Sequence, residues 1–246
     1  MRCPKLLLLS SLTAGRGFGG GGGLTPLLRV LVAAEQVAEA AELAMDNPAF
    51  YNVTIKQFAT PWTNEAQDVF APLNDYTATI IGVVRDDVDF RRILYSDLLY
   101  VGNASPAASP SSNAHYQALE DQHADLSTVL TESSQASQYG TPAEAVAGVL
   151  TTRAAANAFF YAGTNRAMLR FTMMNHMCRD LEQVKDTTRP SDRIRQDVSR
   201  SPGGDSRIFR NSCIGCHSGM DPLAQAFAYY DWEGEQEGNG GRMVYN

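Results

Sequence analysis

The sequence predicts a mainly α fold, and three observations support this prediction. Apolar residues recur at intervals of three and four over most of the 246-residue chain. Segments with the alternating pattern of half-buried strands are few and short. The composition, with 44% hydrophobic and 19% charged residues, is that of an ordinary globular protein long enough to enclose a core.

Residues 1–23 are predicted to be a leader rather than part of the fold. Arg2 and Lys5 precede a short apolar run over 6–14, which is the pattern of a secretory signal peptide. The run is too short to span a bilayer. A wrongly assigned start of the chain is the alternative, which the glycine tract 19–23 favours. We expect a protein exported to the periplasm or the cell exterior, with no membrane span.

Residues 24–145 are predicted to form a helical companion domain. A polar stretch rich in Pro and Ser over 102–113 is expected to be a linker or surface loop, and Asn113 is expected to cap the helix after it. The other expected helices of this domain are 24–45, 71–84 and 90–99.

Residues 146–246, which hold the C-x-x-C-H sequence at 213–217, are predicted to form a second domain, and charge separates it from the first. Residues 24–150 carry 5 basic and 16 acidic side chains, whereas residues 151–210 carry 11 basic and 6 acidic ones. The whole chain has a net charge of −7, which argues against a nucleic-acid partner. Helices are expected over 143–161 and 165–184.

The most informative segment is the C-x-x-C-H sequence at 213–217, because this is the attachment pattern of c-type haem. Two thiols three positions apart can add to the two vinyl groups of one porphyrin, and the adjacent histidine can then ligate the iron. The sequence therefore predicts a covalent haem c, with Cys213 and Cys216 as its anchors and His217 as the proximal iron ligand.

Two other kinds of site use cysteine pairs. A thioredoxin-like redox pair needs a βαβ context, which the helical pattern does not provide. A zinc site needs further ligands, and the chain has no second Cys pair. Haem attachment fits the sequence better than either.

After the motif the chain is expected to turn into a new helix. Asp221 is predicted as its N-cap and Pro222 as its first residue. The new helix would carry an apolar stripe that either covers the macrocycle or packs in the core, namely Leu223, Ala226, Phe227 and Tyr230.

From Cys213 to Asp231 the sequence resembles the haem-attachment end of the Planctomycete-type cytochrome C family of uncharacterised secreted proteins. In that family a C-x-x-C-H is followed by Met-Asp-Pro-Leu, which here is 220–223, and by an aromatic helix ending in Asp. The resemblance covers about residues 48–245 and implies an exported, haem-bearing protein without a specific reaction. We expect family members to continue beyond Asn246, where a distal ligand could then lie.

The second axial position of the iron has several candidate ligands. Met220 is too close to His217 to reach the opposite haem face and is predicted to pack. A Met stripe at helical spacing is also what a core helix carries. His115 and His123, eight positions apart on one predicted helix, are expected to be solvated or at the edge of the core. The distal candidates are His176, Met174, Met177 and Met243.

Three further features bear on the site. Cys178 is expected to be a buried, inert thiol. Trp62 and Trp232 are expected to pack. Arginines before the motif could bind haem propionates, dock an acidic redox partner or form a solvated face; these are Arg189, Arg193, Arg195, Arg200, Arg207 and Arg210.

The sequence favours a protein that binds one haem c and transfers single electrons to a redox partner protein. A haem enzyme with an open distal side, acting on peroxide or oxygen, is the second hypothesis. A structural or interaction module stabilised by haem is the third. An electron carrier is favoured over a catalyst, and the sequence has no Ser-His-Asp order, P-loop, dinucleotide-binding glycine pattern or H-E-x-x-H motif.

Overall fold

The computed structural model describes residues 24–160, 165–185, 207, 211, 213–235 and 240–246. Of this part of the chain, 59% is helical and 9% is strand, and the strands form two two-stranded sheets. The predicted mainly α class is therefore confirmed. No helix among these residues is long and apolar enough to cross a membrane. The predicted leader lies outside the described residues.

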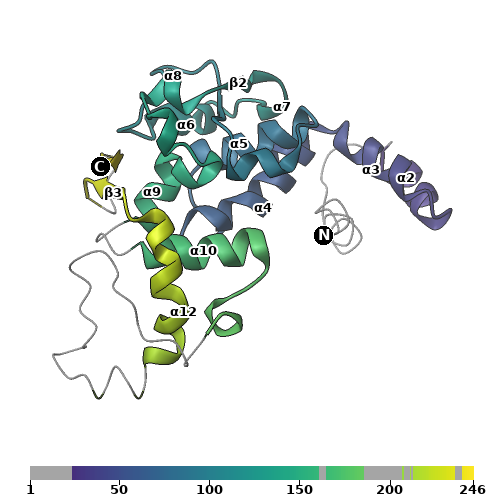
Figure 1. Cartoon of the computed structure of the whole chain (residues 1–246). Helices are drawn as coiled ribbons and strands as arrows, with labels where there is room; N and C mark the ends of the chain where they lie inside the picture. The colour runs from purple at the N-terminus through teal and green to yellow at the C-terminus, as the bar shows by residue number, and fades with distance from the viewer. Residues whose placement is uncertain (1–23, 161–164, 186–206, 208–210, 212, 236–239) are drawn as a thin grey trace.

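The described chain begins with two helices that extend away from the rest of the molecule, α2 (Leu24–Ala33) and α3 (Val37–Met45) (Figure 1). The prediction of one helix over 24–45 is wrong. Glu35 has a φ of 59°, which lies in the left-handed region, and the helix breaks there. Three short helical turns follow: η1 (Phe50–Ile55), α4 (Lys56–Ala59) and η2 (Thr60–Thr63).

Helix α5 (Asp75–Arg85) is the central element of the core, and it contacts α4, α7 and α9. It begins later than the predicted 71–84 because Asn74 caps it, with its Oδ1 accepting the Thr77 N–H at 3.0 Å. Gly82 lets the Tyr100 ring of strand β1 (Leu99–Val101) lie against the helix, since a Cβ there would come within 2.1 Å of the ring.

Short helices surround the first sheet. Strand β1 pairs antiparallel with β2 (Thr131–Ser133), with Leu99 opposite Ser133. The predicted helix over 90–99 is instead a short turn followed by this strand, so that prediction is wrong. The helices of this region are η3 (Phe90–Leu94), α6 (Ala114–Asp121), α7 (Leu126–Val129) and α8 (Gln135–Tyr139).

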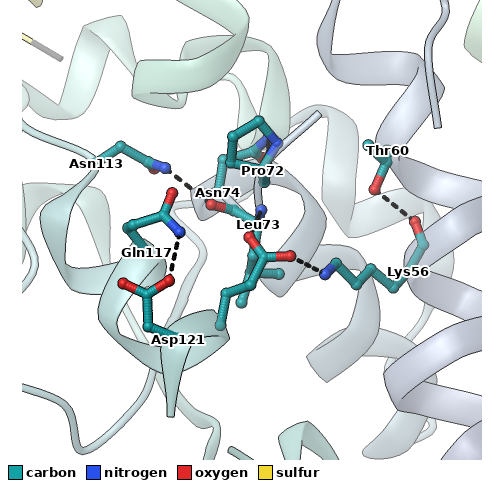
Figure 2. Close-up of polar contacts among 9 residues, drawn as sticks. Lys56, Thr60, Pro72, Leu73, Asn74, Asn113, Gln117 and Asp121 are labelled. Carbon is teal, nitrogen blue, oxygen red and sulfur yellow. Dashed lines mark hydrogen bonds and ion pairs between the residues drawn. The ribbon is translucent and has the colours of Figure 1, made fainter. Parts of the chain in front are cut away.

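Polar contacts fix the segment that leads into α5 (Figure 2). Asn113 occupies the predicted N-cap position of α6, but its side chain makes no capping bond; its Nδ2 instead donates to the Leu73 carbonyl at 2.8 Å. Glu120 of α6 accepts the Leu73 N–H at 2.9 Å and pairs with Lys56 of α4. These contacts tie α4 and α6 to the start of the central helix.

The remaining helices carry the C-x-x-C-H segment. Instead of one helix over 143–161, the chain forms η4 (Ala143–Ala145), η5 (Gly148–Thr151) and α9 (Arg153–Phe159), because Thr152 starts a new helix as an N-cap. Helix α10 (Arg166–Met177) ends at Cys178, with η7 (Leu181–Gln183) after it. The last elements are α12 (Ile214–Ala224), η10 (Gln225–Phe227) and the antiparallel pair β3 (Tyr230–Glu233) and β4 (Arg242–Tyr245).

One hydrophobic cluster contains residues from both predicted domains. Ile80 and Tyr116 come from the first, and Phe160, Phe171 and Trp232 from the second. Helix α12 lies across α10 at the edge of this core (Figure 1). The position of the C-x-x-C-H segment is therefore set by its packing on α10.

Candidate functional site

The C-x-x-C-H residues lie at the start of α12. Cys213 is at the N-cap position, and Cys216 and His217 are in the first turn. Residues three apart on a helix are neighbours on one face, so the two thiols leave the helix on the same side. Neither forms a disulfide; Cys216 is exposed and Cys213 partly exposed.

His217 is held by a carboxylate one helical turn further on. Its Nδ1 lies 3.2 Å from Oδ1 and 3.3 Å from Oδ2 of Asp221. The His217 side chain is 22% exposed, whereas the Asp221 side chain is fully buried. Because the contact uses Nδ1, coordination of a metal ion by this ring would fall to Nε2.

Arg166 pairs with the same carboxylate from the first residue of α10. Its Nε donates to Oδ1 of Asp221 at 2.9 Å and its Nη2 to Oδ2 at 3.3 Å, so the guanidinium spans both oxygens. This two-point geometry suits a planar guanidinium and a carboxylate. A buried charge without such a partner would be strongly unfavourable.

The start of α10 is itself fixed to the chain after α12. Asn165, just before Arg166, donates from Nδ2 to the carbonyl of Phe227 and, at 3.0 Å, to that of Tyr230. Asn165 is buried and has a φ of 53°, a conformation that Asn tolerates better than most residues. Arg166 is thereby aligned with Asp221 across the two helices.

A small apolar cluster between the two helices supports this arrangement. It consists of Leu169, Met173, Met220 and Ala224, with Leu181, Val184 and Phe227 packed against it. Met220 is buried there, as predicted. Gly219 is also required, because a Cβ at this position would lie 2.2 Å from the carbonyl oxygen of Val184.

Asp221 does not cap a new helix, so that prediction is wrong. Helix α12 continues through Pro222, although proline cannot donate to the carbonyl four residues earlier. The Asp221 carboxylate binds His217 and Arg166 instead of the helix N-terminal N–H groups. The i,i+4 spacing of His217 and Asp221 is the sequence signal for this pair, but it indicates contact only if residues 217–221 lie in one helix, whereas Asp-Pro predicts a new helix starting at Asp221.

His176 lies on α10 but contacts other parts of the core. Its Nε2 is 2.7 Å from the hydroxyl of Tyr76 in α5, and its ring meets the Trp62 ring edge-on with centroids 5.3 Å apart. Burial lowers the pKa of His176 to about 4, so the ring is neutral at pH 7 and shares one hydrogen bond with the tyrosine hydroxyl. Ligation of a haem iron by Nε2 would require the contact with Tyr76 to break.

The three candidate methionines lie in different surroundings. Met177, in the last turn of α10, is 52% exposed, and Met174 is partly buried on the same helix. Met243 lies opposite Trp232 in the second sheet and packs against the main core. Trp232 is buried in that core and Trp62 packs against it, as predicted for both.

Cys178 and His115 differ from their predicted settings, whereas His123 is solvent-exposed as predicted. Cys178 is exposed, because it ends α10 in the left-handed conformation, so the prediction of a buried thiol is wrong. His115 is buried, with Nε2 accepting the Gly102 N–H at 3.1 Å and Nδ1 2.8 Å from the Pro106 carbonyl oxygen. His123 is exposed and lies beyond the end of α6, so the two histidines do not share a helix.

Most of the arginines predicted to bind propionates or a partner lie outside the described residues. Arg207 is the exception, and it is exposed. Within α10, Arg170 forms a second two-point pair, with both its Nε and Nη2 at 3.0 Å from Asp180. Arg170 also interacts electrostatically with Cys216, so this pair lies near the motif without binding His217.

No group of three or more His, Cys, Asp or Glu in the described ranges is arranged to hold a metal ion. No protein-family model, curated protein or solved structure matches the chain.

Proposed function

We propose that this chain binds one haem c covalently through Cys213 and Cys216 and transfers single electrons. The observation that carries the proposal is the C-x-x-C-H sequence whose histidine is held through Nδ1 by a buried carboxylate. Two unpaired thiols on one side of a helix, next to an imidazole oriented in this way, are the donor set that a c-type haem needs. When bound, the haem would supply one-electron redox chemistry.

Residues of this chain would anchor the haem, ligate its iron and orient the ligating imidazole. The two thiols would anchor the porphyrin as thioethers, and Nε2 of His217 would approach the iron from one face. Asp221 and Arg166 would fix the imidazole orientation, and the apolar cluster around Met220 would hold α12 on α10. Export to the periplasm or exterior and a redox partner protein belong to the proposal.

The distal ligand distinguishes the carrier from the second candidate, a haem enzyme that acts on peroxide or oxygen. One observation favours the enzyme. A carboxylate that accepts a hydrogen bond from Nδ1–H makes the imidazole a more basic ligand. A more basic ligand favours the higher oxidation states of iron. A distal methionine from Met174, Met177 or Met243 would favour the carrier, because it closes the second axial position and raises the potential.

The test is an absorption spectrum of the protein exported from a host with c-haem maturation machinery. We expect a c-type reduced spectrum in which the haem survives acid–acetone extraction. A C213A/C216A double variant should lose the haem, whereas C178A, which removes an exposed thiol outside the motif, should keep it. Carbon monoxide then separates the candidates, because rapid binding indicates an open distal side. A protein without haem, or with extractable haem, would contradict the proposal.

A further inference from the structure

The hydrogen-bonding groups around His217 determine which ring nitrogen carries the proton. An ionised carboxylate has only acceptors, and both oxygens of Asp221 already face the guanidinium donors of Arg166. The contact at 3.2 Å from Nδ1 is therefore a hydrogen bond only if Nδ1 is protonated. In the neutral imidazole this leaves the Nε2 lone pair as the one that can bind a metal ion.

We infer that Asp221 and Arg166 form a built-in device that sets the reduction potential of an iron bound by His217. The inference rests on the proposed function and deepens it. Asp221 is a positioning residue, since it acts through the imidazole, and Arg166 determines how much of the carboxylate's charge the imidazole experiences. The carboxylate would favour ferric over ferrous iron, because the ferric ion carries one more positive charge.

The surroundings make this effect strong and specific. The Asp221 side chain is fully buried and that of Arg166 is only 17% exposed, so solvent screens the pair weakly. Asn165 fixes the backbone next to Arg166. The close approach of Gly219 to Val184 fixes the part of α12 that carries Asp221. The helix backbones therefore hold Asp221 between His217 and Arg166, and turning the carboxylate away would break its two-point pair with Arg166.

The two residues should shift the potential in opposite directions. D221N retains an acceptor of similar shape but removes the charge, so the reduction potential should rise. R166Q removes the guanidinium charge that partly neutralises the Asp221 carboxylate. The imidazole then experiences more of the negative charge, so the reduction potential should fall. A purely structural role predicts no such opposition of sign.

The experiment compares reduction potentials of the haem-loaded protein and these two variants with D180N. D180N removes the two-point pair between Asp180 and Arg170 of α10, the helix that also carries Arg166, at a carboxylate that does not contact His217. We expect D221N to shift the reduction equilibrium at least tenfold, which is about 59 mV for one electron. D180N should stay close to the unsubstituted protein, and D221E should recover part of the shift.

A second measurement needs no variant and covers the case in which the variants do not fold. In protein with ¹⁵N-labelled histidine, reduced and made diamagnetic with carbon monoxide where the sixth position is open, we expect the His217 proton on Nδ1. A slowly exchanging Nδ1–H whose proton resonance is shifted downfield by a hydrogen bond to Asp221 supports the inference, and an Nδ1–H that exchanges as fast as that of an exposed imidazole overturns it. A folded, haem-loaded D221N with the potential of D180N also overturns it, whereas absence of haem from the unsubstituted protein refutes the proposed function itself.

Discussion

The carboxylate of Asp75 accepts the backbone N–H of Arg153 at 2.6 Å, across 78 positions of the chain. The same carboxylate accepts the N–H of Ala154 at 3.0 Å and the hydroxyl of Tyr139 at 3.2 Å. These two N–H groups open helix α9 and have no partner within it. A buried residue at the start of α5 thus caps α9, on which α10 packs.

We expect D75N to lower the free energy of unfolding by about 2–4 kcal/mol, measured by urea denaturation. The amide nitrogen would face donors where Asp75 now presents an acceptor oxygen to each side. D97N is the matched control, because Asp97 accepts the Gln135 N–H at 2.7 Å and the Ala136 N–H at 3.3 Å but is exposed. Water can replace that carboxylate, so D97N should cost about 1 kcal/mol or less. Equal losses in the two variants would contradict the role of burial.

The sequence predicts helix content better than it predicts helix boundaries, and particular residues show why. Apolar periodicity locates α5 and α10, but it cannot detect the break at Glu35 and Gln36, because so short an interruption leaves the apolar spacing unchanged. The sequence predicts a helix where strand β1 lies, because three residues are too few to establish a period of two. The cap that Asp75 provides depends on a partner 78 residues away, which no local pattern encodes.

Some residues of the candidate site can also be predicted from the sequence, and others cannot. Cys213, Cys216 and His217 are identifiable because attachment chemistry demands adjacent residues. Asp221 also stands out in the sequence, but Asp-Pro is typical of a helix start and therefore predicts a capping role for it. Arg166 could not be identified as its partner, since only the packing of α10 on α12 brings the two together.

Two glycines in α12 should respond to alanine in opposite ways. At Gly219 the new Cβ would come within 2.2 Å of the Val184 carbonyl, so G219A should push α12 away from the segment after α10 and cost about 1–3 kcal/mol. At Gly215 a Cβ meets nothing within 4 Å, so G215A should be neutral or stabilise by up to about 1 kcal/mol, since alanine favours helix. Thermal or urea unfolding of both variants measures the difference. A G219A protein as stable as G215A would show that the approach of α12 to Val184 is not close in solution.

The stability of the protein should fall between pH 7 and pH 4.5, in part because of His176. Burial lowers the pKa of His176 from 6.5 to about 4, so the folded state resists a proton that the unfolded chain accepts. The contribution is therefore complete above pH 6.5 and is lost progressively as the pH falls toward 4. Burial also raises the pKa of Tyr76, so its hydroxyl keeps its proton over this range and stays hydrogen-bonded to Nε2.

H176Q tests this contribution, because glutamine can hydrogen-bond to Tyr76 but does not titrate. The full shift corresponds to about 3 kcal/mol, and partial exposure of the ring reduces the expected effect to about 2 kcal/mol. Urea denaturation at pH 7 and pH 4.5 should therefore show a loss of stability that is about 2 kcal/mol smaller in H176Q than in the unsubstituted protein. If both proteins lose the same amount, His176 is accessible to protons in the folded state, and its contact with Tyr76 does not persist at acid pH.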